Sequence, residues 1–242
     1  MVDFVFQTGS LLGEVRRLLQ IGGLMRPGRT AHVKRLICAD VMVILGAVAT
    51  SAAGLVFPGG NPGSATATVK GNKFYLANRV LEMEWHVVGR ALKPGYIRNK
   101  IANETVSLEG GVGFAVVLAD GTVMTADDLR IVEAPHAVRL VPTPAGSRFS
   151  ERMPGWKITA LFGAPDGRYD VDWQLILRDG ANAVRQQITL RAKSAPVQFC
   201  CLRLIDLPLS GARVAGVVPG SPVVAGNFFA ACEHPEAVTH VA

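Results

Sequence analysis

The sequence lacks the side-chain patterns that mark the commonest metal and nucleophile sites. Its four cysteines include no C-x-x-C pair, and its five histidines have no metal-ligand spacing between them, so we expect no metal site. The nucleophile turn G-x-S-x-G is absent as well. Ser221 precedes Pro222, which has no N–H for an oxyanion hole, so Ser221 is interpreted as a turn residue. We expect neither a cofactor nor a catalytic residue that the sequence alone can name.

The chain also lacks any run of basic residues interleaved with aromatic ones. The net charge is +6, and half of it lies in residues 1–53. The remaining charges of both signs are scattered along the body of the chain. A nucleic-acid surface needs clustered Lys and Arg, so we expect no nucleic-acid partner.

An apolar run long enough to span a membrane is missing too. Four basic residues (Arg26, Arg29, Lys34 and Arg35) precede the apolar run Val41–Ala49, which ends in a small-residue cleavage pattern at Ala47-Val48-Ala49. The run is shorter than the roughly 20 residues of a membrane helix. We interpret residues 1–53 as a secretory signal region whose true start is Met25, and we expect a periplasmic or secreted protein without a stable membrane span. In an alternative hypothesis the apolar run is retained as the anchor of an envelope protein.

Three cysteines lie beyond the predicted signal. Cys200 and Cys201 are adjacent and would point to opposite faces of a strand, and Cys232 lies near the end of the chain. We favour free, buried thiols. A single disulfide to Cys232 in an oxidising compartment stays open as the alternative.

What the chain does have is abundant glycine, 26 residues, and 14 prolines, together with strand-like runs every eight to twelve or so residues. Alternation of apolar and polar residues is clearest from Tyr169 to Leu177, and Asp120-Gly121 is a hairpin turn between two β-branched runs. Residues 54–66 are interpreted as a linker. Residues 67–242 are predicted to form a large antiparallel β-sandwich, so the fold class is all-β.

Few residues in this body are candidates for a binding site. Trp156 follows Met153-Pro154-Gly155 near a strand start and is the best candidate for stacking on a sugar ring, whereas Trp173 is expected in the core. Glu233 and His234 form the most site-like pair, although neighbours on a strand point to opposite faces. The aspartates are interpreted as turn residues or as parts of solvated strand faces.

The order of several segments resembles a known family. The segments are FYLANRVLEMEWHV, GRALKPGYIRNKIANETV, GFAVVLADGTVMTADDLRI, GRYDVDWQLILRDGANAVRQQITLRA and LRLIDLPLSGARVAGVVPGSPVVAGNFFAACEHP. Together they resemble the N-terminal galactose mutarotase-like β-supersandwich domain of secreted bacterial α-galactosidase-like glycoside hydrolases, a group often labelled "enterotoxin". The resemblance rests on Leu76-Ala77-Asn78, Arg178–Gly180 and Gly220–Pro235.

This resemblance implies a galactose mutarotase-like supersandwich and an exported, non-catalytic module that contacts carbohydrate through a concave sheet face. From the residues themselves, Trp156, Glu233 and His234 are the candidates for carbohydrate binding. In such enzymes the catalytic carboxylates belong to a (β/α)-barrel that follows the sandwich, so the partners implied are carbohydrate and a barrel on a downstream or split chain. The alternative is a mutarotase-like or lyase-like enzyme. It requires a histidine from the set His86, His136 and His234 to converge with a carboxylate such as Glu233 on the concave sheet face.

Overall fold

The computed structural model describes residues 2–8, 16–24, 60–234 and 237–241. Within these residues every paired strand is antiparallel to its neighbours, and the only helix is the single 3₁₀ turn η1, Phe149–Arg152. The prediction of an all-β, antiparallel fold is therefore confirmed.

The strands form three sheets. The large sheet has eight strands, in the order β10 (Arg130–Leu140), β11 (Gly155–Gly163), β12 (Tyr169–Arg178), β13 (Ala183–Ala192), β1 (Val2–Thr8), β17 (Phe228–Cys232), β16 (Val223–Ala225) and β15 (Arg213–Val214). The β3–β7 sheet runs in chain order through β3 (Thr66–Lys70), β4 (Lys73–Ala77), β5 (Leu81–Val88), β6 (Ala91–Asn99) and β7 (Glu104–Ser107). The β14 sheet has the order β18 (Ala237–Val241), β2 (Arg16–Leu24), β14 (Phe199–Ser210), β8 (Ala115–Leu118) and β9 (Val123–Thr125).

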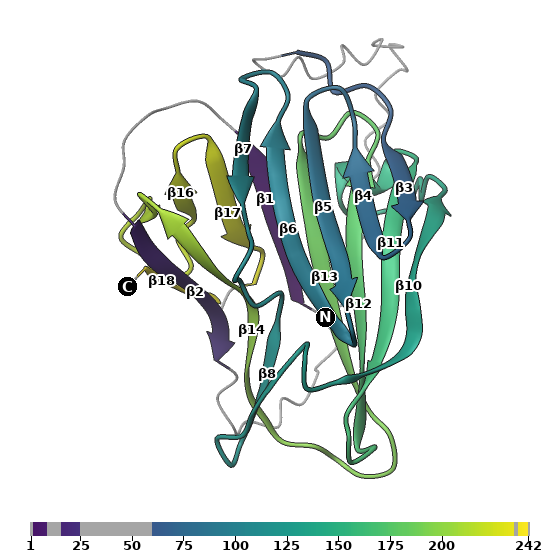
Figure 1. The fold of residues 1–242 in the computed structure, drawn as a ribbon, viewed down its shortest axis with the longest axis vertical. Coiled ribbons are helices and arrows are strands. Elements are labelled where there is room, and N and C mark those ends of the chain that lie inside the picture. Colours follow the sequence, from purple (N-terminus) through teal and green to yellow (C-terminus); the bar gives the residue numbers. More distant parts are fainter. Residues whose placement is uncertain (1, 9–15, 25–59, 235–236, 242) are drawn as a thin grey trace, which may run out of the picture.

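The β3–β7 sheet lies face to face with the large sheet, and Figure 1 shows β4, β5 and β6 in front of β11, β12 and β13. Between the two layers, Trp85 of β5 and Trp173 of β12 are fully buried with their ring centroids 4.9 Å apart. Tilted aromatic pairs of this kind add attraction beyond the apolar area they bury. Trp173 therefore occupies the core, as predicted, and Trp85 lies there with it.

The alternation in the sequence explains why the large sheet has one apolar face. Along β12 every second residue from Tyr169 to Leu177 is buried, and the residues between them are partly exposed. On the neighbouring strand β13, Val184, Gln186 and Ile188 are buried on the same face of the sheet. Since neighbouring side chains of a strand point to opposite faces, the core face and the outer face are fixed together.

Strand β14 is central in its sheet, as its apolar composition predicts. This sheet is tied to the large sheet by Gln186, whose Nε2 donates to the carbonyls of Gly113, at 2.8 Å, and of Leu204, at 3.1 Å. The two sheets also pack together here: the ring of Phe114, just before β8, lies edge to face with that of Phe162 on β11, with the ring centroids 5.6 Å apart. Gln186 is fully buried, so its two hydrogen bonds lie within the core.

The turns follow the glycine and aspartate signals. Strands β8 and β9 pair across Asp120-Gly121, and Gly121 has a φ of 86°. The Asp166 carboxylate accepts from the backbone N–H of Arg168 at 3.0 Å, which closes the turn before β12. The predicted hairpin and the turn role of Asp166 are both confirmed. Ser221 is also a turn residue, because its hydroxyl donates to the carbonyl of Val218 at 2.7 Å.

Two segments near the N-terminus form strands inside the sheets. Val2–Thr8 lies between β13 and β17, and Arg16–Leu24 lies between β14 and β18, although both segments precede the start expected at Met25. The predicted signal run Val41–Ala49 lies outside the described residues. No helix in the described part of the chain has the length and apolar character that crossing a membrane requires. Residues 60–65 belong to the predicted linker. The N–H of Ala65 donates to the carboxylate of Asp179, which directly follows β12 of the large sheet, at 2.8 Å.

The cysteines differ in part from expectation. Cys200 and Cys201 form no disulfide, but both are partly exposed on β14 rather than buried, and Cys232 at the end of β17 is partly exposed as well. Burial still raises the pKa of the Cys201 thiol, with a smaller contribution from neighbouring Cys200. The prediction of buried thiols is therefore wrong in their exposure. The two cysteines lie at the start of β14, where the pairing with β8 shifts register between Phe199 and Cys201, and burial in the core begins only at Leu202.

Candidate functional site

The outer face of β12 and β13 points away from the core and carries polar side chains. Gln174, Ile176 and Arg178 occupy this face on β12, and Arg185 and Gln187 occupy it on β13. Each alternates with buried residues of its strand, so the face is built by the same period of two that forms the core.

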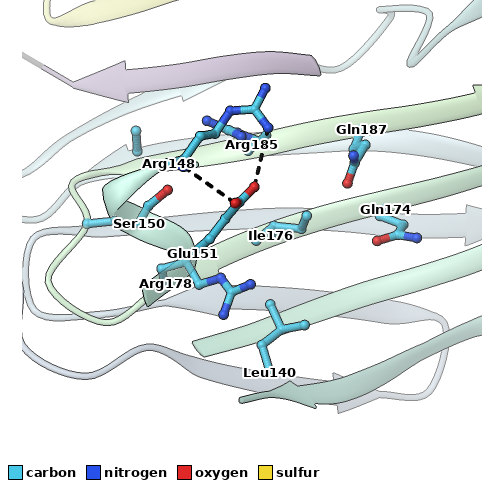
Figure 2. A pocket seen from close by; sticks show the side chains of 11 residues that line it. Leu140, Arg148, Ser150, Glu151, Gln174, Ile176, Arg178, Arg185 and Gln187 are labelled. Atoms are coloured by element: carbon cyan, nitrogen blue, oxygen red, sulfur yellow. Dashed lines mark hydrogen bonds and ion pairs between the residues drawn. The ribbon is translucent and has the colours of Figure 1, made fainter. Parts of the chain in front are cut away.

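A pocket of about 270 Å³ lies on this face. The segment that connects β10 to β11, which contains η1, contributes Arg148, Ser150 and Glu151. Figure 2 shows the three arginines and Glu151 gathered at one side of the pocket and Gln174 and Gln187 at the other. Ile176 and Leu140 supply apolar contact between them.

Two glycines let the connecting segment approach the sheet. A Cβ atom at Gly146 would lie 2.8 Å from the Cβ of Glu151, and one at Gly155 would lie 2.7 Å from the Cα of Arg178. Both distances are shorter than real Cβ contacts. The segment is also held by the backbone, since the N–H of Thr143 donates to the carbonyl of Glu151 at 2.8 Å. The wall of the pocket is thus a fixed turn.

Charged groups form a network along this wall. Glu151 accepts from the backbone N–H of Arg148 at 3.5 Å and from its Nη1 at 3.3 Å. Glu233 pairs with Nη2 of Arg185 at 2.9 Å and with Nε of Arg148 at 3.3 Å. Burial of the Glu151 carboxyl opposes its ionisation, but the hydrogen bonds from Arg148 outweigh burial and hold its pKa below the usual value.

Arg178 differs from the other two arginines of the pocket. Its Nη1 donates to the carbonyl of Met153 at 2.7 Å and to that of Val141 at 3.2 Å. Within the described residues it forms no ion pair with a carboxylate. Burial lowers the pKa of the Arg178 guanidinium, and Glu151 offsets only part of that effect. A charged group has therefore lost hydration without gaining an anionic partner.

The two glutamines of the pocket also differ. The amide of Gln174 is engaged on both sides, accepting from Nζ of Lys157 at 3.2 Å and donating to Asp172 at 3.1 Å. The side-chain amide of Gln187 makes no hydrogen bond to any described residue. Gln187 therefore offers both a donor and an acceptor to a ligand.

The structure separates the residues that the sequence singled out. Glu233 lies beside the pocket through its pairs with Arg185 and Arg148, and His234 follows it half-buried at the end of β17. Trp156 lies opposite core residue Leu177 in the register of β11 and β12, so it shares the core side of the sheet. The guanidinium of Arg139 lies 5.3 Å from the centre of its ring. Trp156 and Glu233 are therefore not parts of one site.

His86 and His136 do not converge with Glu233. Nδ1 of His86, on β5, lies 3.6 Å from Glu84, and Nδ1 of His136, on β10, lies 3.6 Å from Glu133. Neither distance is a hydrogen bond, and each histidine faces a carboxylate of its own strand. Among the described residues no group of three His, Cys, Asp or Glu side chains could hold a metal ion.

Sequence reasoning missed the arginines and Gln187 because the outer face looks solvated. The alternation does place Gln174, Arg178, Arg185 and Gln187 on one face, but nothing in the pattern shows that the segment before β11 folds over that face. The remaining signal was the glycine pair that frames this segment, Gly146 and Gly155, since glycines often mark a close backbone approach.

Comparison of the chain with protein-family models, with curated proteins and with solved structures gives no match. The candidate site therefore rests on its geometry.

Proposed function

We propose that this chain is a non-catalytic carbohydrate-binding module that holds its ligand in the pocket on the outer face of β12 and β13. The single observation that carries the proposal is this pocket, of about 270 Å³, where convergent polar groups surround a small apolar surface. Small-molecule sites of about 300–1,000 Å³ have this character. The pocket lies just below this range, which suits one sugar ring better than a long oligosaccharide.

The composition of the pocket suits a sugar. Guanidinium and amide groups bind hydroxyl oxygens through directed hydrogen bonds, while Ile176 and Leu140 can contact the C–H face of a ring. We propose further that the module is related to the N-terminal supersandwich of α-galactosidase-like glycoside hydrolases and acts beside a (β/α)-barrel partner that performs the hydrolysis. The antiparallel all-β architecture supports this proposal at the level of fold class alone.

The test is a glycan-array binding experiment with the full chain, with release of free sugar measured in parallel. We expect binding without turnover, and we expect Gln187→Ala to weaken that binding. Release of sugar by the chain alone would contradict the non-catalytic role. Loss of binding in Trp156→Phe, with Gln187→Ala unaffected, would place the ligand on the opposite side of the sheet.

A further inference from the structure

We propose that the pocket selects saccharides that carry a negatively charged oxygen group, a carboxylate or a sulfate ester, and that Arg178 binds this group. The inference rests on the proposed function, because it names the class of carbohydrate that the module takes.

The balance of charge is the first support. Arg148, Arg178 and Arg185 line the pocket, whereas Glu151 is its one acidic residue. Counting Glu233, which lies beside the pocket, the two carboxylates pair with Arg148 and Arg185. Arg178 is left as a positive charge that the described residues do not neutralise, so a ligand with one negative charge balances the site.

The geometry of Arg178 is the second support. Its two hydrogen bonds to carbonyls both come from Nη1, and they fix the plane of the guanidinium. Nε and Nη2 make no hydrogen bond to the described part of the chain. An arginine held in this way presents two parallel N–H donors, the arrangement that matches the two oxygens of a carboxylate or a sulfate.

Gln187 completes the recognition. Its amide has no partner among the described residues, and it lies on β13 across the pocket from Arg178 in Figure 2. A sugar that places its charged group on Arg178 can direct a ring hydroxyl toward this amide. Charge is thus recognised at one side of the pocket and the sugar at the other.

The test is calorimetric titration of the full chain with a matched pair of probes, galacturonate and its methyl ester, which differ by one negative charge at the same position. Galactose 6-sulfate is the third probe and distinguishes sulfate from carboxylate recognition. We expect at least one acidic probe to bind about tenfold or more tightly than the ester, the size expected of a charge-assisted hydrogen bond. We also expect this preference to shrink as salt rises, through screening.

Three variants locate the effect. Arg178→Lys keeps the charge but loses the two-pronged donor, and it should lose most of the preference for the acidic probe. Gln187→Ala removes no side-chain hydrogen bond to a described residue, so this variant should fold normally and bind every probe more weakly. The matched control is Arg191→Ala, which removes an exposed arginine of β13 that pairs with Asp172 outside the pocket; it should bind as the unmodified chain does.

The outcomes separate the two proposals. Equal binding of acid and ester, or binding of neutral glycans alone, overturns the charge inference and leaves carbohydrate binding intact. Absence of binding to every glycan, charged or neutral, overturns both. An acidic preference that survives in Arg178→Lys overturns the role of Arg178.

Discussion

Gln186 and Gln187 show how one position along a strand changes the role of the same side chain. Gln186 points into the core and donates to the carbonyl of Leu204 on β14 and to that of Gly113, which precedes β8. Gln187 points to the outer face, and its side chain makes no hydrogen bond to a described residue. Adjacent residues of β13 therefore face opposite sides of the sheet, Gln186 within the core and Gln187 at the proposed binding pocket.

This difference leads to a prediction about stability. Gln186→Leu keeps a side chain of similar size but removes both hydrogen bonds. The carbonyls of Gly113 and Leu204 then lose their buried donor. We expect the free energy of unfolding to fall by about 2–3 kcal/mol. Urea denaturation measures this change, with Gln187→Ala as the matched control, expected to stay within about 0.5 kcal/mol. Equal losses in the two variants would show that Gln186 does not bridge the sheets.

The β5–β6 pair carries a carboxylate whose ionisation is coupled to the fold. Glu82 accepts from the hydroxyl of Tyr96 at 2.7 Å and pairs with Nζ of Lys100 at 3.3 Å. Burial favours its neutral form, but these hydrogen bonds outweigh burial and lower the pKa of Glu82 below 4.5. The same carboxylate, together with burial, raises the pKa of Tyr96.

The sign of this shift fixes its pH dependence. A carboxyl with a lowered pKa in the folded state stabilises the fold above its unfolded pKa, and this contribution is lost as the pH falls through the folded value. Glu82→Gln should therefore cost about 1 kcal/mol near neutral pH and progressively less under acid conditions. Unfolding free energies measured across this range test it, with exposed Glu109→Gln as the control. A cost that does not change with pH would contradict the assignment.

The strands themselves were largely predictable, and the pocket was not. Alternation from Tyr169 to Leu177 and the turn at Asp120-Gly121 are local signals, because the period of two and the turn chemistry act over a few residues. The pairing of β1 with β13 and β17 joins segments far apart in the chain, and no local pattern records it. The free guanidinium edge of Arg178 depends on where the carbonyls of Val141 and Met153 lie, which is a tertiary property.

At the scale of the whole molecule, β1 and β2 are interior strands. β1 separates β13 from β17, and β2 separates β14 from β18. Interior strands satisfy the backbone groups of a neighbour on each side, so removing one leaves two unpaired edges.

A chain beginning at Met25 should therefore fold poorly. We expect it to lose a cooperative unfolding transition or to self-associate, as measured by circular dichroism and size-exclusion chromatography. The matched control deletes residues 237–242 and so removes β18, which lies at the edge of the β14 sheet, and its effect should be milder. If the chain from Met25 unfolds as cooperatively as the full chain, β1 and β2 are dispensable and the start at Met25 gains support.

The position of β1 also determines the order of events during synthesis. β1 is synthesised before the other described strands, but Phe4 of β1 pairs with Cys232 of β17, which is more than 200 residues further along the sequence. β10 to β13 are joined in chain order and can assemble while translation continues. β1 can pair with β13 as soon as β13 is made, but the opposite edge of β1 stays open until β17 has been synthesised, and contacts of such long sequence separation form slowly. The interval between the synthesis of β13 and the docking of β17 is therefore when the large sheet is most exposed to misassembly.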